Sequence, residues 1–380
     1  MSKSIPPDRM RHTTPAGRPA APATVGRPGT VVITGGSGFI GCNLADSFLA
    51  DGRDVVILDN LSRPGVEQNL AWLEQRHGAR VHPLQADIRD AAAIEQAFAD
   101  ARAVFHLAAQ TAVTTSLDDP RDDFTVNALG TLNVLEAVRR TGRRVPVVFA
   151  STNKVYGSLA DLTMVELEDR YMPADGDIRR SGIGEDRGLD LCTPYGCSKG
   201  AADQYVLDYA KSYGIPTAVL RMSCIYGPRQ FGTEDQGWVA HFAISALEGR
   251  PVTIFGTGKQ VRDILHVSDA VAAYRAVLDG IERVSGHAFN LGGGPGNAVS
   301  LELVLRQIAE LTGRPVETER QSWRQGDQPY FVADTRKLAD ALGWKARIGW
   351  QEGLRDLAEW LAESRGLPLA ASRRPAKALA

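Results

Sequence analysis

Short runs of apolar, often β-branched residues alternate with stretches of helical periodicity over more than half of the chain. The apolar runs are Thr30–Ile33, Val55–Leu58, Val81–Leu84, Ala103–Leu107, Val145–Phe149 and Thr217–Leu220. Helical spacing marks segments between them, including Phe39–Ala50, Ala91–Ala99 and Phe124–Arg139. Apolar runs without strict alternation are typical of strands buried on both faces, so this order predicts an α/β fold with a doubly wound parallel sheet.

The pattern changes after about Tyr226, where shorter helices and strands rich in Gly and Pro follow. Two of these segments, Leu301–Leu311 and Trp350–Leu361, have the spacing of amphipathic helices. We therefore expect a sheet domain over residues 29–225 and a smaller mixed α/β lobe that makes up most of residues 226–363.

Three further segments have little periodicity. Residues 157–194 are rich in charge and glycine, and we expect a lid or an ordered insertion over a site. Residues 1–28 contain six prolines and five basic residues without an apolar signal-peptide core, and residues 364–380 end in a similar composition. We expect both ends to be disordered tails.

Composition excludes several classes of protein. The 380 residues include 43 Lys and Arg against 45 Asp and Glu, so the basic excess of a general nucleic-acid or anionic-membrane binder is missing. No apolar stretch reaches about 18 residues, the length that predicts a transmembrane helix. The four cysteines and the histidines have no spacing typical of a disulfide framework or a metal site. We expect a reduced, cytoplasmic protein without a metal.

A glycine-rich segment follows the first apolar run and opens the next helix. Gly35 can form the tight turn, Gly38 can let backbone N–H groups approach a pyrophosphate, and Gly41 can let the helix pack closely on the sheet. The second run is followed by Asp59, whose carboxylate can accept the ribose hydroxyls of a dinucleotide. This carboxylate would repel a 2′-phosphate, so NAD is favoured over NADP, although Arg63 nearby weakens that preference. The alternative is a plain strand–helix turn with a capping Asp.

A Tyr-x-x-x-Lys motif at Tyr195 and Lys199 suggests catalysis. In a helix the two side chains stand one turn apart on the same face. A free phenol, with a pKa near ~10, is a poor base, and a neighbouring ammonium and a nicotinamide cation favour the phenolate. Ser151 and Thr152 follow an apolar run, and a hydroxyl there can share the substrate proton. An ordinary amphipathic helix also explains the motif alone; we predict Thr152, Tyr195 and Lys199 as the catalytic residues.

The remaining cofactor contacts are expected at the ends of the third and fourth runs. Asp87 and Ile88 are placed for the adenine edge, with a helix N-cap as the alternative for Asp87. Small residues after His106 leave room for the cofactor backbone. The predicted cofactor-binding residues are Gly35, Gly38, Phe39, Ile40, Gly41, Asp59, Asn60, Ser62, Arg63, Asp87, Ile88, Leu107, Ala108, Ala109, Gln110, Tyr195 and Lys199.

The glycine turn, Asp59, the Ser151-Thr152 pair and the Tyr195/Lys199 motif resemble the extended short-chain dehydrogenase/reductase family, the NAD-dependent nucleotide-sugar epimerases and dehydratases. The resemblance covers about residues 30–363 and implies a Rossmann-type sheet with a C-terminal lobe that binds the nucleotide sugar. Within the family, the chain is most similar to CDP-sugar 2-epimerases of the paratose/tyvelose type. The strings that carry this similarity are Asp59–Arg63, Ser151–Gly157, Tyr195–Tyr205, Arg229–Phe231, Asp235–Val239 and Gly258–Asp263.

The residues after Thr152 favour one reaction. In the related 4,6-dehydratases an Asp-Glu pair follows the Thr, whereas Asn153 and Lys154 stand here and cannot act as a carboxylic acid or carboxylate base. The resemblance therefore implies epimerisation at C2 of a CDP-hexose through a transient keto sugar, with NAD regenerated in each cycle. An NDP-hexose 4-epimerase is the main alternative; a 4,6-dehydratase and a non-catalytic NAD-binding protein are less favoured.

A nucleotide diphosphate is best held by guanidinium groups. The resemblance implies that Arg262 and Arg324 meet the phosphates and that Asp327 meets the ribose or positions an arginine; Trp238 lines the pocket or packs in the lobe core. Many relatives carry Asn where this chain has Cys224, which we expect to be a buried packing residue. The predicted substrate-binding residues are Asn153, Lys154, Arg229, Gln236, Trp238, Arg262, Arg324 and Asp327.

The family also implies a partner for the chain itself. Its members often form homodimers, and sometimes tetramers, through a four-helix bundle. The helices predicted at Phe124–Arg139 and Tyr195–Tyr213 are the expected contact. Neither a nucleic acid nor a membrane is an expected partner.

Overall fold

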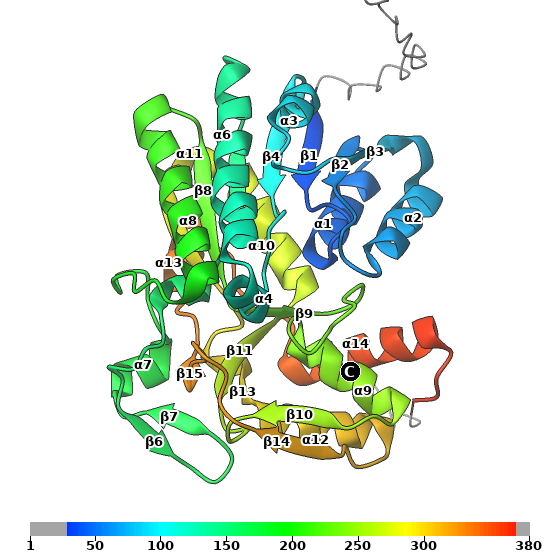
Figure 1. Cartoon of the computed structure of the whole chain (residues 1–380), viewed down its shortest axis with the longest axis vertical. Helices are drawn as coiled ribbons and strands as arrows, with labels where there is room; N and C mark the ends of the chain where they lie inside the picture. Colours follow the sequence, from blue (N-terminus) through cyan, green and yellow to red (C-terminus); the bar gives the residue numbers. More distant parts are fainter. Residues whose placement is uncertain (1–28, 370–380) are drawn as a thin grey trace, which may run out of the picture.

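The computed structural model describes residues 29–369, with a sheet domain above a smaller lobe in the view of Figure 1. The predicted tail over residues 1–28, and residues 370–380 of the second tail, lie outside the described residues. Within the described range, no helix combines the length and apolar character that crossing a membrane requires.

The sheet domain is built on seven parallel strands. Their spatial order is β3 (Val81–Gln85), β2 (Val55–Asp59), β1 (Thr30–Thr34), β4 (Ala101–His106), β5 (Val147–Thr152), β8 (Thr217–Met222) and β12 (His287–Leu291). Every neighbouring pair is parallel. The predicted doubly wound sheet is confirmed. The order in which successive strands are added reverses between β1 and β4, and such sheets bind ligands at this point.

Helices cover both faces of the sheet because alternate strand residues point in opposite directions. Val31 and Ile33 of β1 belong to one apolar core with α1 (Phe39–Ala50) and α10 (Val267–Asp279). Val32 belongs to the core on the other face, with α3 (Ala91–Phe98), α6 (Gly130–Arg140) and α8 (Thr193–Tyr213). β1 is therefore buried on both faces, as its unbroken apolar run predicts, whereas the edge strand β3 is partly exposed.

The predicted helix Phe124–Arg139 is interrupted. The chain forms α5 (Pro120–Phe124), then a π-helical turn over Thr125–Leu129, and then α6. Within the π turn, Asn127 Oδ1 accepts the Gln110 backbone N–H at 2.9 Å, and its Nδ2 donates to the Gln110 carbonyl at 3.0 Å. The turn thus fixes the loop after β4, which borders the site described below.

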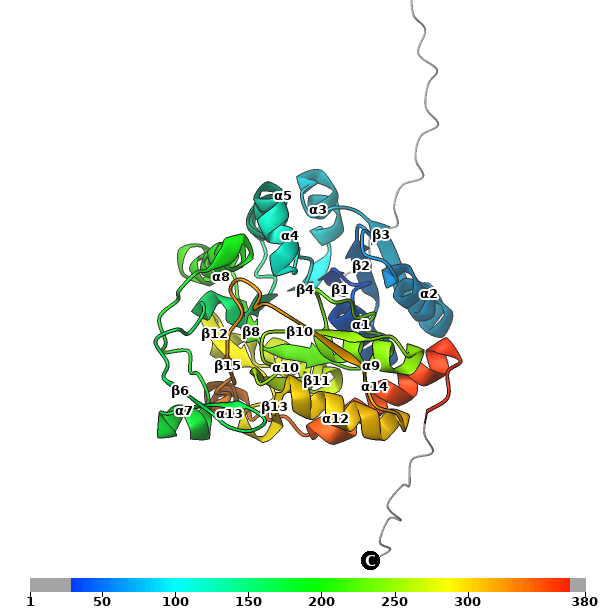
Figure 2. The ribbon, with the colours of Figure 1, turned by 60° about the horizontal axis from the view of Figure 1, so that its bottom comes forward.

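The lobe is built around β11 (Val261–His266), which pairs in parallel with β9 (Cys224–Tyr226) and β15 (Tyr330–Phe331) and antiparallel with β13 (Ala298–Ser300). A second small sheet pairs β10 (Val252–Phe255) with β14 (Thr318–Gln321). Figure 2 shows α9 (Trp238–Glu248), α12 (Leu301–Thr312) and α14 (Trp350–Arg365) side by side in this lobe, around a common apolar core.

Two boundaries differ from the prediction. β12 and α10 lie in the stretch that we expected to form mainly the lobe, but β12 completes the main sheet beside β8 and α10 packs on α1. At the other end, α14 continues to Arg365, and Leu367 and Leu369 pack against the lobe core. The predicted tail from residue 364 therefore begins too early, because its first apolar residues are partly buried against the lobe.

The segment 157–194 is an ordered insertion. It forms a hairpin of β6 (Met164–Glu166) and β7 (Tyr171–Pro173), followed by α7 (Gly176–Ser181). Ile183 then pairs with Ala333, and both belong to a small apolar cluster with Phe331. The insertion thus packs on the lobe near β15.

We predict that Gly41→Ala destabilises the protein through the contact between α1 and the turn before it. A Cβ on Gly41 would lie 2.2 Å from the Gly35 carbonyl oxygen and 2.8 Å from the Gly36 Cα, both backbone atoms. Overpacking of this kind costs about 1–3 kcal/mol. Urea unfolding should show a lower midpoint, whereas Gly188→Ala, at an exposed site with open space around it, should unfold like the parent. Equal midpoints for both variants would contradict this expectation.

Candidate active site

A cavity of about 1030 Å³ lies between the carboxyl ends of the sheet strands and the lobe. Pockets for single small ligands are typically about 300–1,000 Å³, so this one has room for a dinucleotide and a second ligand. Every cofactor, catalytic and substrate residue predicted from the sequence lines it. Residues 155–194 contribute nothing to the lining, so the lid interpretation of the insertion is wrong.

The glycine turn fits a dinucleotide. Gly35 has a φ of 68°, and a Cβ there would lie 2.7 Å from the Ala108 backbone nitrogen, so the turn closes only with glycine. Gly38 is the N-cap of α1 and provides no capping side chain, which leaves the first N–H groups of a 12-residue helix available. Such a helix start binds phosphate groups through its N–H donors.

Asp59 is fixed beside this turn. Its Oδ2 accepts the Ser37 N–H at 3.0 Å and its Oδ1 accepts the Leu61 N–H at 2.9 Å. Burial raises the pKa of Asp59, while these backbone donors and the Arg63 charge lower it. Each carboxylate oxygen retains a lone pair, so Asp59 can brace the turn and still accept ribose hydroxyls.

At the adenine end, Asp87 is held by Arg89. The two form an ion pair at 2.7 Å, and Asn60 Nδ2 also donates to Asp87 at 3.2 Å. Hydrogen bonding from Arg89 lowers the pKa of Asp87 to about 2, so the carboxylate is ionised at neutral pH. The N-cap of α3 is Asp90, which accepts from two backbone N–H groups. The helix-cap alternative for Asp87 is therefore wrong.

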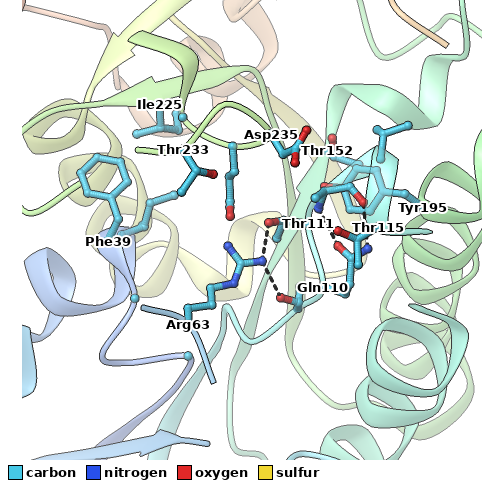
Figure 3. A pocket seen from close by; sticks show the side chains of 18 of the residues that line it. Phe39, Arg63, Gln110, Thr111, Thr115, Thr152, Tyr195, Ile225, Thr233 and Asp235 are labelled. Atoms are coloured by element: carbon cyan, nitrogen blue, oxygen red, sulfur yellow. Dashed lines mark hydrogen bonds between the residues drawn. The ribbon is translucent and has the colours of Figure 1, made fainter. Parts of the chain in front are cut away.

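Tyr195 and Thr152 meet at the base of the cavity. Tyr195 lies in the first turn of α8, is 7% exposed, and is hydrogen-bonded to the Thr152 side chain. Figure 3 shows both side chains pointing into the cavity that Arg63 also enters. Burial raises the pKa of Tyr195, and the Thr152 hydrogen bond and the Arg63 charge lower it.

Lys199 has a different environment from the one predicted. Its Nζ donates to the Ala150 carbonyl at 2.7 Å and lies 4.1 Å from the centroid of the Phe149 ring. Burial lowers the pKa of Lys199 to about 7, against the opposite effect of nearby carboxylates. The cation that lowers the pKa of Tyr195 in this structure is Arg63, because the Lys199 ammonium is committed to the backbone of β5.

Buried polar contacts that the sequence analysis missed hold α8 in place. Asp203 of α8 pairs with Arg221 at 3.0 Å and accepts Ser151 Oγ at 2.7 Å. Nearer the catalytic end, Ser198 Oγ donates to Asp123 at 2.5 Å. Charged residues on the inner face of a helix are the one signal in the sequence that could have indicated this network.

The lobe side of the cavity carries a compact cluster of charges. Arg262 Nη2 lies 2.6 Å from Asp327 Oδ1, and Lys154 Nζ lies 3.8 Å from the same oxygen while donating to the Gly326 carbonyl at 3.0 Å. Both cations lower the pKa of Asp327 against the effect of burial. Two cations against one carboxylate leave a positive excess that suits a phosphate. The alternative of Lys154 as a solvated strand-end lysine is wrong.

Arg324 and Trp238 also have protein partners. Arg324 pairs with Glu234 at 3.0 Å and with Asp235 at 3.3 Å, and its guanidinium stacks 3.8 Å from the Phe255 ring centroid. Trp238 Nε1 donates to the Cys224 sulfur at 3.4 Å. Its ring packs on the lobe core and also lines the cavity, so both interpretations of this residue hold in part. Burial raises the pKa of Cys224, which keeps it a neutral thiol.

Arg229 lines the cavity and also contacts two aromatic rings. Its guanidinium lies 3.9 Å from the ring centroid of Trp72 in α2 (Val66–His77) and 5.8 Å from that of Trp360 in α14. Cation–π contacts on two rings use the side chain to join the sheet domain to the lobe. The sequence motif gave no sign of these partners, because both tryptophans are distant along the chain.

Gln236 lines the cavity as predicted, within a tight turn that pairs it with Thr233. Other residues that line the cavity were not predicted. Figure 3 shows Thr233, Asp235 and Ile225 from the lobe, Thr111 from the loop after β4 and Thr115 from α4 (Val113–Asp118) around the same space. None of these residues is part of a distinctive motif, which is why the sequence did not single them out.

Comparison with known proteins places this geometry in a family. The model of the "NAD dependent epimerase/dehydratase family" matches residues 31–292. CDP-paratose 2-epimerase of Salmonella typhi is 41% identical over 337 residues, which cover 87% of this chain and 98% of that protein. UDP-glucose 4-epimerase of Mycolicibacterium smegmatis is 34% identical over 331 residues, covering 87% and 97%. The crystal structure of the Thermus thermophilus UDP-glucose 4-epimerase in complex with NAD superposes with a TM-score of 0.72 at 34% identity, covering 87% and 98%.

We predict that Asp59→Asn weakens NAD binding at least about tenfold, the effect of losing one charge-assisted acceptor. The carboxamide replaces one acceptor oxygen by an N–H donor, so it cannot serve Ser37, Leu61 and the ribose hydroxyls together. NAD titration calorimetry on cofactor-stripped protein measures this. Asp279→Asn, exposed at the end of α10 and outside the cavity, is the matched control, and a Kd equal to the control's would contradict the role of Asp59.

Proposed function

This chain belongs to the NAD dependent epimerase/dehydratase family, and we propose that it inverts C2 of the hexose in a CDP-sugar. The observation that supports this most is the 41% identity to CDP-paratose 2-epimerase over nearly the whole of that protein, against 34% to UDP-glucose 4-epimerase. The residues around the catalytic tyrosine are consistent with it, because they allow oxidation and reduction without elimination.

In the proposed reaction, bound NAD supplies the oxidation and the reduction of the sugar carbon. Tyr195, as phenolate, accepts the proton of the C2 hydroxyl and returns it when the keto sugar is reduced. Thr152, which is hydrogen-bonded to Tyr195, holds the same substrate oxygen. The glycine turn and Asp59 orient the dinucleotide toward this pair.

Elimination lacks its catalysts in this site. Asn153 Nδ2 is hydrogen-bonded to Gln328 Oε1 at 3.3 Å, and Lys154 is part of the charge cluster with Asp327. An amide and an ammonium cannot act as the carboxylic acid and carboxylate base of a dehydratase. A keto sugar formed here is therefore reduced again, and inversion follows when it presents its other face.

We propose that Lys154, Arg262 and Arg324 bind the nucleotide diphosphate. The first two share one carboxylate, so part of their charge is free for phosphate oxygens. When the substrate binds, Arg324 would leave its ion pairs with Glu234 and Asp235 and pair with the diphosphate instead. Epimerisation at C4 of an NDP-hexose is the second candidate, because the same Tyr195 and Thr152 pair serves it if the sugar sits differently.

We further propose a homodimer through α5, the π turn and α8. This face carries exposed apolar side chains, with Phe124 58% exposed, Leu129 42%, Tyr205 49% and Tyr213 52%. Exposed aromatic groups gathered on one face are typical of protein interfaces.

The four cysteines are free thiols, which supports the expected reducing, cytoplasmic setting.

An isotope experiment separates the two epimerisations. With CDP-paratose deuterated at C2, we expect a primary kinetic isotope effect, because that C–H bond breaks in the oxidation step. The same sugar deuterated at C4 should react at the unlabelled rate. An effect from the C4 label alone would remove the C2 proposal and favour C4 epimerisation.

We expect Tyr195→Phe to lower kcat by about 10²–10⁴-fold, the usual contribution of a positioned acid–base group. The ring and its packing remain, so NAD binding and the thermal midpoint should stay near those of the parent. Ser212→Ala, which removes an exposed hydroxyl from the same helix, is the control. Full activity of Tyr195→Phe on CDP-sugars would disprove the proposed proton transfer.

A further inference from the structure

The side chain of Arg63 crosses the cofactor half of the cavity. It starts on the loop after β2, and its Nη2 donates to Thr111 Oγ1 at 2.6 Å on the loop after β4. A longer contact of 3.5 Å reaches the Ala109 carbonyl. Figure 3 shows both interactions as Arg63 points into the cavity. One side chain thus connects the two loops between which a dinucleotide would lie, the loop that follows Asp59 and the loop that packs on Gly35.

The charge of Arg63 lies between the two ends of the cofactor site. Its guanidinium interacts electrostatically with both Asp59 and Tyr195. Asp59 marks the adenosine ribose and Tyr195 marks the nicotinamide, and the pyrophosphate links these two parts of a dinucleotide. A cation with both neighbours therefore lies along the path of the pyrophosphate.

Arg63 also differs in its partners from the other cations of this cavity. Of the seven Lys and Arg side chains that line it, Arg63 alone bonds only loop atoms, a neutral side-chain oxygen and a backbone oxygen. The other six make different contacts. Arg89 pairs with two carboxylates, Lys199 donates a hydrogen bond to the β5 backbone, and Arg229 contacts two tryptophan rings. Lys154, Arg262 and Arg324 pair with carboxylates of the lobe. Only Nη2 of Arg63 is used, which leaves the Nε and Nη1 donors for an anion.

We infer that Arg63 binds the pyrophosphate of NAD and, held by Thr111, acts as a strap that keeps the dinucleotide in its groove. The backbone N–H groups at the start of α1 supply one set of donors to the phosphates, and the Arg63 fork supplies a second set with a full charge. This inference rests on the cofactor site of the proposed function and is independent of the sugar. It also explains why an arginine next to Asp59 need not indicate NADP, since its side chain is directed to the loop after β4.

The test is the rate at which bound NAD exchanges. Holoenzyme is mixed with excess deuterated NAD, and the fraction of unlabelled NAD still bound is followed by mass spectrometry after rapid desalting. Arg63→Met should exchange about 10- to 100-fold faster than the parent, the effect of one charge-assisted bond pair. Two further variants should exchange NAD at rates between those of the parent and Arg63→Met. Arg63→Lys keeps the positive charge but loses the forked guanidinium, and Thr111→Val removes the hydroxyl that holds Arg63. Arg102→Met removes the same charge from an exposed position on β4 outside the cavity and should exchange like the parent.

Thermal unfolding of the NAD-free variants shows whether each one folds. If Arg63→Met does not fold, the exchange rate of Thr111→Val decides the test. Exchange by Arg63→Met or Thr111→Val at the parent rate overturns the inference. A loss of NADP affinity with unchanged NAD exchange also overturns it, because Arg63 would then bind a 2′-phosphate. If the parent protein binds no NAD at all, the cofactor site of the proposed function fails, which is a different result from a failure of the strap.

Discussion

The position of Tyr195, the proposed catalytic tyrosine, depends on a buried ion pair between α8 and the sheet. Asp203 of α8 is bound by Arg221 of β8 and by Ser151 of β5, and these side chains are shielded from water. A buried ion pair is tolerated only if its remaining hydrogen-bonding capacity is satisfied, and Arg221 also donates to a buried tyrosine hydroxyl. This network fixes the rotation of α8 about its axis. With that rotation set, Tyr195 meets Thr152 at the end of β5.

The same burial sets the charge requirements of the site. Desolvation raises the pKa of Tyr195 and lowers that of Lys199 to about 7, so burial disfavours the charged form of each group. A phenolate can form in this place only with compensating positive charge. Arg63 supplies part of it from the cofactor side, and bound NAD brings the positive nicotinamide. Binding of the cofactor and ionisation of the tyrosine are therefore coupled, because both draw on charge in one poorly solvated cavity.

The sequence predicted what local patterns determine. Strands, the helix Phe39–Ala50 and the glycine turn follow from apolar runs and from glycine spacing, and each lies where it was expected. Features set by contacts between distant residues were missed or misread. The π turn at Thr125–Leu129 has ordinary helical spacing, yet it depends on hydrogen bonds to the loop after β4. The contacts of Arg229 with Trp72 and Trp360 likewise depend on the packing of the lobe on α2, so no local pattern indicates them.

To invert a carbon centre, the sugar must turn while the bound NAD and the nucleotide diphosphate stay in place. The distribution of side chains along the cavity suits this requirement. Charged and hydrogen-bonded anchors gather at its two ends, around Asp59 on the cofactor side and around Asp327 on the lobe side. Between them, the loop after β4 and the helix α4 (Val113–Asp118) that follows it contribute short side chains. One of these, Thr114, has a buried hydroxyl without a hydrogen-bond partner among the described residues. A short hydroxyl side chain can exchange one sugar oxygen for another at little cost, whereas a guanidinium fork would hold a single orientation. Strong anchors at the ends and adaptable groups between them are what a reaction without elimination needs from its site.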